Sequence, residues 1–206
     1  MMIQSRGADS PRGADPLRID ELAIPRFPGI IGMTSCPGRK LVFPCRGLRG
    51  RGGDNGSIHE GDRDRDLAAD LAVIQTWGAE ILLSLIEPRE YAIYGVERMR
   101  ELIPEGILHL QFPIPDGSTP DAFWEKSWEV ASPGIRAILR RGGRVCVHCI
   151  GGLGRTGLVA ARLLVELGAQ PEEAIRMVRK ARPGAIETAA QEDYVRSLLP
   201  TRDSFS

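Results

Sequence analysis

A glycine-rich turn between a short apolar run and an amphipathic segment constrains the fold of this chain more than any other feature. The run from Arg144 to His148 has the length and pattern of a buried strand, and Thr156 to Leu167 has the pattern of a helix. The turn between them carries Gly151, Gly152 and Gly154, which permit positive φ values and a close backbone approach. This strand-turn-helix order is typical of an α/β protein, with the turn at the carboxyl end of the strand.

The same turn has the composition of an anion-binding site. Its backbone N–H groups can point at one anion, and the N-terminus of the following helix adds a partial positive charge. Arg155 stands six positions after Cys149 and can hold two phosphate oxygens at once. A helix N-terminus and a cation also favour the thiolate form of a cysteine. We therefore expect Cys149 to attack phosphorus and form a phosphocysteine intermediate, whereas Cys146 lacks these neighbours and is expected to be a packed core residue.

Attack on a phosphate ester also needs an acid that protonates the departing oxygen. Asp116 is the first candidate, because it lies in a Pro-Asp-Gly loop between an expected strand and an expected helix. Its position alone fits an ordinary turn residue equally well. Asp121 is the reserve candidate, although its place in a first helical turn favours a structural role. Thr156 can donate a hydrogen bond to the sulfur of Cys149, cap the helix, or do both.

The segment from His148 to Thr156 fits the pattern HCxxGxxR followed by serine or threonine. It resembles the signature of the cysteine-dependent protein tyrosine and dual-specificity phosphatases. Together with the segments 114–121 and 184–191, it is most similar to the kinase-associated phosphatase (cyclin-dependent kinase inhibitor 3) branch, over residues 24–199. Two positions depart from that branch: Thr156 replaces a typical serine, and Glu187 stands where we expect glutamine.

The resemblance implies a fold, an activity and a set of site residues. The fold would be a three-layer α/β sandwich with a central, mostly parallel sheet flanked by helices. Cys149, Arg155, Asp116 as general acid, and Thr156 would be catalytic, without a metal or cofactor. Gln191 would orient the hydrolytic water, or be only a surface residue at a helix start. His148 would be structural, with its ring hydrogen-bonded to the backbone of the loop. The residues expected to bind the substrate phosphate are Ile150, Gly151, Gly152, Leu153, Gly154, Arg155 and Gln191.

The leading functional hypothesis is a protein phosphatase that hydrolyses phosphotyrosine, with phosphoserine and phosphothreonine as further candidate substrates. One alternative is a small-molecule, phosphoinositide or RNA phosphatase with the same loop. Ile150 and Leu153 add no positive charge, which favours a singly phosphorylated ester over a polyphosphorylated inositol. A phosphopeptide-binding module without turnover is a second alternative, against which the intact Cys149, Arg155 and Asp116 argue. Arsenate reductase chemistry would need an early nucleophile, whereas Cys149 lies late in the chain.

Composition limits the partners and the compartment. The 206 residues include 27 basic and 27 acidic ones, so no global field favours nucleic acid or an anionic membrane. No apolar run reaches the roughly 18 residues of a membrane span, and the N-terminus does not have the pattern of a signal peptide. We expect a cytoplasmic protein with a phosphorylated protein as substrate, and the sequence leaves its oligomeric state open.

One catalytic domain, 23–200, is expected between a flexible tail at 1–22 and a short tail at 201–206. Within the domain, the arginine- and glycine-rich loop 36–62 includes Cys36 and Cys45. It is either a solvated connector or a basic lip that recruits acidic substrates. The remaining expected elements are strands at 81–86 and 107–112 and helices from Arg65, at 91–102 and after Gln170. A further helix is expected to be capped by Thr119, to bury Phe123 and Trp124, and to kink or break at Pro133.

Overall fold

The computed structural model describes residues 16–40 and 64–200. These residues form one five-stranded sheet in the order β1-β2-β5-β3-β4, in which only β1 runs antiparallel to its neighbour. The strands are β1 (Asp20–Ala23), β2 (Ile30–Thr34), β3 (Ile81–Ser84), β4 (Leu108–Gln111) and β5 (Arg144–His148). The helices are α1 (Leu67–Thr76), α2 (Pro88–Ile93), α3 (Met99–Leu102), α4 (Ala122–Arg140), α5 (Gly154–Glu166), α6 (Pro171–Ala181) and α7 (Ala189–Ser197).

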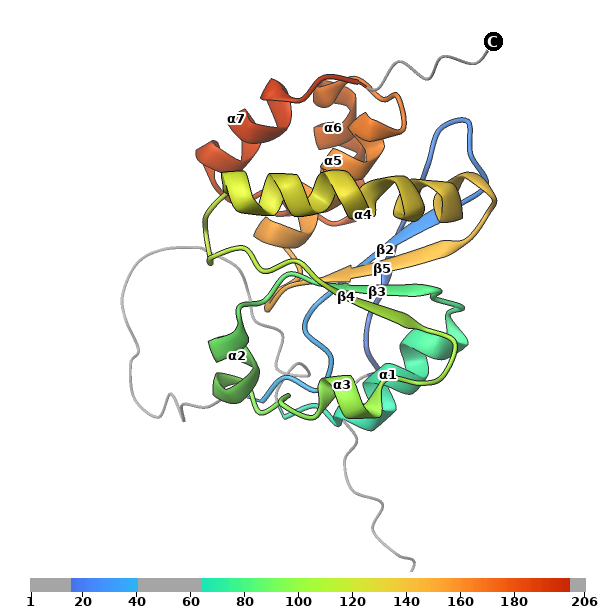
Figure 1. The fold of residues 1–206 in the computed structure, drawn as a ribbon, viewed down its shortest axis with the longest axis vertical. Helices are drawn as coiled ribbons and strands as arrows, with labels where there is room; N and C mark the ends of the chain where they lie inside the picture. Colours follow the sequence, from blue (N-terminus) through green and yellow to red (C-terminus); the bar gives the residue numbers. More distant parts are fainter. Residues whose placement is uncertain (1–15, 41–63, 201–206) are drawn as a thin grey trace, which may run out of the picture.

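The helices cover both faces of the sheet, which confirms the predicted three-layer sandwich. In Figure 1, α1, α2 and α3 lie on one face and α4 to α7 lie on the other. Helix α5 is central to its layer, since all 13 of its residues are buried. Strand β3 is buried along its length and β5 is buried from Val145 onward, because parallel strands with helices on both faces meet little solvent.

The strand directions bring distant segments to one edge of the sheet. Strands β2, β5, β3 and β4 run parallel, with Thr34 and Ser84 both level with His148 in the ladder. The segments that follow these strands therefore meet beside the glycine-rich turn. These segments are the residues from 35 onward after β2, the connection between β3 and α2, the loop after β4, and the glycine-rich turn after β5.

Three sequence predictions about helices were wrong. The expected helix 91–102 is two short helices, because Gly95 adopts φ +66° between them. Helix α4 is capped by Asp121, whose side chain accepts a hydrogen bond from the Trp124 backbone at 2.8 Å, rather than by Thr119. It also continues through Pro133 to Arg140 without the expected break, while the alternative, a kink at Pro133, stays a prediction.

Another error concerns the burial of Phe123, which is 80% exposed. The buried face of α4 instead carries Trp124 and Trp128, which stack at 4.8 Å between ring centroids. A difference of one position, 100° around the helix, separates Phe123 from Trp124 and decides which ring is buried.

The N-terminal boundary of the fold also differs from the prediction. The last residues of the expected flexible tail, 20–22, belong to β1, and Leu17 and Leu22 are buried in the core. Asp20 is also buried and forms an ion pair with Arg182 at 2.6 Å, which links this strand to the end of α6. Residues 16–22 therefore belong to the packed fold, and residues 1–15 lie outside the described residues.

Candidate active site

Cys149 directly follows β5 and lies at the base of the glycine-rich turn. It is 4% exposed, and the backbone N–H of Gly152 points at its Sγ atom from 3.3 Å. Helix α5 begins at Gly154, so the turn receives the positive end of a 13-residue helix. Gly152 has φ +73°, and a Cβ there would lie 2.4 Å from the carbonyl oxygen of Thr34. The turn can therefore keep this shape only with glycine at that position.

Arg155 is fixed before any substrate arrives. Its Nη1 and Nη2 atoms lie 2.6 Å and 3.0 Å from the two carboxylate oxygens of Glu90, and Nη1 also donates to the Ile114 carbonyl at 3.1 Å. Burial disfavours the charged guanidinium, but the Glu90 hydrogen bonds and the nearby Cys149 and Asp116 outweigh that effect and raise the pKa of Arg155. A permanently charged, oriented arginine is suited to a phosphate dianion.

Glu90 is a site residue that the sequence analysis missed. It is 6% exposed and comes from α2, 65 positions before Arg155. The local sequence indicates only a helix start: Pro88 is at the first position, and Glu87 and Glu90 form a capping box. Nothing in that pattern predicts that the carboxylate turns toward a distant arginine, because the contact depends on the neighbouring positions of β3 and β5.

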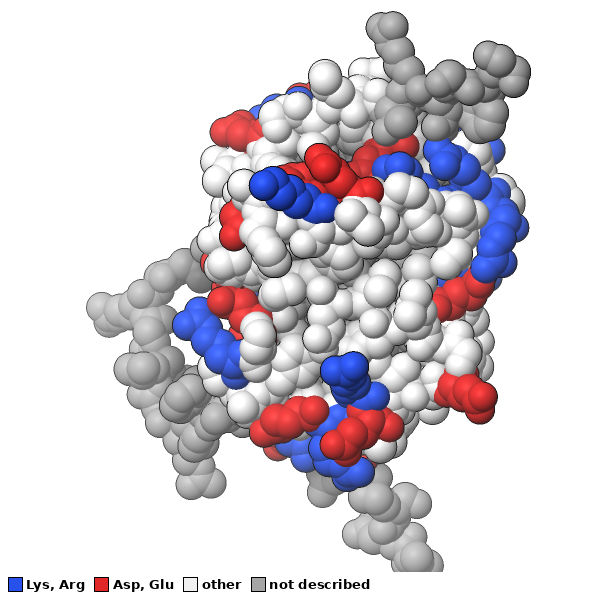
Figure 2. Space-filling view, in the orientation of Figure 1, with Lys and Arg blue, Asp and Glu red and all other residues white. Residues whose placement is uncertain are grey.

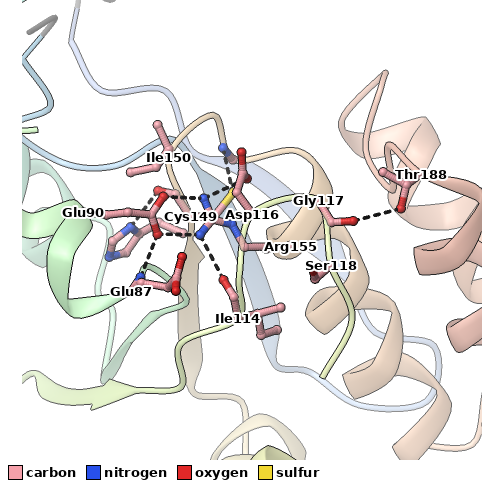
Figure 3. Close-up of polar contacts among 12 residues, drawn as sticks. Glu87, Glu90, Ile114, Asp116, Gly117, Ser118, Cys149, Ile150, Arg155 and Thr188 are labelled. Atoms are coloured by element: carbon pink, nitrogen blue, oxygen red, sulfur yellow. Dashed lines mark hydrogen bonds and ion pairs between the residues drawn. The ribbon is translucent and has the colours of Figure 1, made fainter. Parts of the chain in front are cut away.

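Asp116 reaches the same guanidinium from the opposite side. Its Oδ1 atom lies 3.0 Å from Nη2 of Arg155, while its side chain is 81% exposed. Figure 3 shows Glu90, Asp116 and the Ile114 carbonyl around Arg155, with Cys149 beside it. A phosphate that binds Arg155 would compete with Asp116 for Nη2, and this would place the carboxyl group next to the ester.

His148 supports the turn through a chain of hydrogen bonds that has one direction. Its Nδ1 atom lies 3.0 Å from the Cys149 carbonyl, which only accepts, so Nδ1 carries the proton. Burial lowers the pKa of His148 to about 4, so Nε2 is an acceptor and receives the hydroxyl proton of Ser84 at 2.6 Å. Ser84 Oγ in turn lies 2.8 Å from Nε2 of His109, which must be the donor there. The chain runs from His109 on β4 through Ser84 on β3 to the nucleophile's own peptide unit.

The other two expected site residues have different surroundings. Thr156 lies fully buried in the first turn of α5, and its hydroxyl has no hydrogen-bond partner among the residues described. Gln191 is also fully buried, so it is not the surface residue that the sequence left open. Its Oε1 accepts from the backbone of Glu187 and Thr188, and its Nε2 donates to the Ser118 carbonyl at 3.3 Å. Each polar atom of Gln191 is thus engaged with backbone.

Part of the expected basic lip belongs to the floor of the site. Arg39 is 5% exposed, and its Nη1 lies 3.4 Å from the carbonyl of Ile150. The backbone N–H of Cys36 donates to the same carbonyl at 3.0 Å. Burial raises the pKa of the Cys36 thiol, which favours its protonated form. The rest of the expected lip, with Cys45, falls within 41–63, outside the described residues.

The structure thus brings Cys149, Arg155 and Asp116 together at one edge of the sheet. The turn 150–154, which we call the cradle, directs the Gly152 N–H at the Cys149 sulfur, and Glu90 and the Ile114 carbonyl hold the arginine. Within 16–40 and 64–200, no group of three or more His, Cys, Asp or Glu side chains could hold a metal ion. The arrangement can bind a phosphate, attack it with sulfur and offer a proton to its leaving oxygen.

Comparison with known proteins identifies the family. Residues 63–169 match the family described as "Polymorphic toxin system, DSP-PTPase phosphatase". Cyclin-dependent kinase inhibitor 3 from Rattus norvegicus is 34% identical over 158 residues, covering 70% of this chain and 72% of the relative. The Homo sapiens protein of the same name is 32% identical over 156 residues, with the same coverage.

Solved structures agree with these matches. The crystal structure of kinase associated phosphatase, with its catalytic site cysteine replaced by serine, has a TM-score of 0.70 and 28% identity. The match covers 87% of this chain and 92% of that one. The resemblance predicted from the phosphate-loop signature is therefore confirmed. The chain belongs to the superfamily of cysteine-dependent protein tyrosine and dual-specificity phosphatases.

Proposed function

We propose that this protein hydrolyses phosphate monoesters on proteins, at phosphotyrosine and also at phosphoserine or phosphothreonine. The observation that carries the proposal is the convergence of three groups: Cys149 Sγ with the Gly152 N–H directed at it, the fixed guanidinium of Arg155, and the exposed carboxyl of Asp116 on that guanidinium. The relatives named cyclin-dependent kinase inhibitor 3 and kinase associated phosphatase support a protein substrate.

In the first step, the Cys149 thiolate attacks phosphorus and forms an S–P bond as the P–O bond to the substrate breaks. Backbone N–H groups of 150–154 and Arg155 hold the three non-bridging oxygens, where charge is concentrated in the transition state. Asp116 gives its proton to the departing oxygen. The products are the dephosphorylated side chain and a phosphocysteine.

In the second step, water attacks phosphorus, its proton goes to the Asp116 carboxylate, and the S–P bond breaks to release phosphate. The buried hydroxyl of Thr156, which has no partner among the residues described, would donate to the departing thiolate of Cys149. Gln191 would act indirectly, because its amide joins α7 to the loop that follows Asp116.

The surroundings of the cradle favour a singly phosphorylated substrate. Ile150 and Leu153 bring no charge to the turn, and the guanidinium of Arg182 is paired with Asp20 and the Gly151 carbonyl. The face seen in Figure 2 carries clusters of both signs around a broad uncharged area.

The described cysteines support a reducing compartment such as the cytoplasm, since Cys36, Cys146 and Cys149 are all free. No helix within the described ranges has the length and apolarity needed to cross a membrane. We extend the proposed catalytic domain to residues 16–200, because β1 and Leu17 belong to the packed fold.

The test compares Cys149→Ser with Cys146→Ala as its matched control. The serine variant should lose turnover of phosphotyrosine peptides while it still binds them, because a hydroxyl is a far weaker nucleophile in an otherwise preserved cradle. Cys146 is fully buried in β5, with its pKa raised to about 12, so its alanine variant should remain active. Activity should also survive EDTA. Turnover by the serine variant at nearly the wild-type rate would contradict the mechanism. Loss of wild-type activity on chelation with EDTA would contradict it too.

A further inference from the structure

Glu187 lies at the rim of the phosphate cradle, in a segment that is tightly fixed. Its Oε2 atom is 2.5 Å from the point where a Cβ of Gly154 would stand, so the carboxylate lies against the last glycine of the turn. The residue before it, Ile186, has φ +60°, a costly conformation for a β-branched side chain. Arg179 holds this backbone by donating to the carbonyls of Ala185 and Ile186, at 3.2 Å and 3.1 Å.

The same segment also contacts the loop that carries the expected acid. Thr188, directly after Glu187, donates a hydrogen bond to the Gly117 carbonyl at 3.4 Å (Figure 3). Ile186 donates its backbone N–H to the carbonyl of Leu153 at 3.4 Å. The side chain of Glu187 therefore lies where the phosphate loop and the acid loop approach each other.

The Glu187 carboxylate is exposed and has no cationic partner in the described part of the chain. The other carboxylates described around the cradle each contact an arginine: Glu90 and Asp116 share Arg155, and Asp20 pairs with Arg182. The turn itself supplies no lysine or arginine other than Arg155. Among the described residues, Glu187 is thus a rim carboxylate without an arginine or lysine contact, at the position where the family resemblance led us to expect a neutral glutamine.

We infer that Glu187 is a specificity-determining residue that favours phosphorylated segments with a lysine or arginine beside the phosphorylated residue and disfavours those with a neighbouring acid or second phosphate. The inference rests on the proposed function. Repulsion of the bound phosphate itself is common to all substrates and cancels in a comparison between them. What remains is the interaction of Glu187 with the flanking charge, which at an exposed site changes kcat/KM by roughly three- to tenfold.

The experiment measures kcat/KM for three sets of phosphotyrosine peptides that differ only in the flanking residue, which is Lys, Gln or Glu at each position from two before to three after the phosphotyrosine. Wild type is compared with Glu187→Gln, which keeps the shape and removes the charge. Glu105→Gln is the matched control: Glu105 is exposed and precedes β4, at the opposite edge of the sheet. A small aryl phosphate without flanking residues serves as the reference substrate.

Wild type and Glu105→Gln should prefer the best lysine peptide over the corresponding glutamate peptide by roughly three- to tenfold, and Glu187→Gln should lose most of that preference. The preference should shrink in 1 M salt, where the screening length is about 3 Å. Glu187→Gln should also process the aryl phosphate at least as well as wild type. Equal selectivity in wild type and Glu187→Gln would overturn the inference while leaving the proposed function intact. Absence of turnover on every phosphopeptide, with aryl phosphate still hydrolysed, would instead refute the protein substrate.

Discussion

The ion pair between Arg155 and Glu90 makes a quantitative prediction about folding. Both side chains are buried, at 1% and 9% exposure, and they share two hydrogen bonds. Replacing Glu90 with glutamine keeps an oxygen acceptor but leaves the guanidinium without its buried counter-ion. Breaking a buried pair in this way costs about 3–5 kcal/mol. Because Asp116 still faces Arg155, we expect the lower end, about 3 kcal/mol, or a fall of roughly 6–12 °C in Tm.

The cost should depend on the arginine charge, which a double-mutant cycle can show. Glu90→Gln, Arg155→Met and the double variant would be unfolded in urea, with tryptophan fluorescence as the readout. If the penalty comes from an unpaired buried charge, the double variant should be more stable than the sum of the single effects predicts, by about 2–3 kcal/mol. Glu87→Gln removes the same charge three residues earlier, from a more exposed carboxylate, and should change stability by less than about 1 kcal/mol.

Activity provides an independent measurement of the same contact. An arginine that is no longer oriented by Glu90 should reduce kcat/KM by about 100-fold, as expected for misplacement of a group on the transferred phosphate. Additive stability effects in the cycle, with a coupling below about 0.5 kcal/mol, would refute the idea that this pair holds the arginine in place.

Three further perturbations test other parts of the site. Asp116→Asn should slow phosphothreonine and unactivated phosphotyrosine peptides far more than aryl phosphates with good leaving groups, and should abolish the basic limb of the pH–rate profile; equal losses would move the acid elsewhere. Gly152→Ala should abolish phosphate binding and lower Tm, because its Cβ would meet the Thr34 carbonyl at 2.4 Å. Titration calorimetry with tungstate, a phosphate analogue, measures the binding, and scanning calorimetry measures Tm. Burial lowers the pKa of His148 and of His109 from 6.5 to about 4. As the pH falls from about 6.5 to 4, these histidines are therefore protonated in the unfolded chain but neutral in the folded protein. Stability should decrease over that window, by roughly 3 kcal/mol for His148 alone, and urea midpoints should show a smaller decrease in His109→Gln.

The features that the sequence predicted are local ones. The cradle, the start of α5 and the position of Cys149 beside Arg155 all lie within eleven consecutive residues, where spacing alone determines the geometry. The order of strands and helices was likewise readable from short apolar runs, and the mostly parallel sheet followed from their alternation.

The features that the sequence did not predict are contacts between distant elements. Glu90 reaches Arg155, and His109 reaches His148 through Ser84, only because β3 lies between β5 and β4. The choice of Asp121 over Thr119 as a cap could not be made from residue type, since both side chains cap helices well. Gly95 ended a helix that its neighbours favoured, through a positive φ that the apolar pattern does not encode.

The cap of α7 has a consequence for how the acid loop can move. Gln191 accepts hydrogen bonds from the backbone N–H groups of Glu187 and Thr188, which directly precede its helix, and donates to the Ser118 carbonyl, two residues after Asp116. Thr188, the other half of the capping box, donates to Gly117. We therefore expect fraying of this helix end to be coupled to release of the acid loop. Hydrogen exchange at the amides of Glu187, Thr188 and Gln191 would thus report how often the acid leaves the phosphate site.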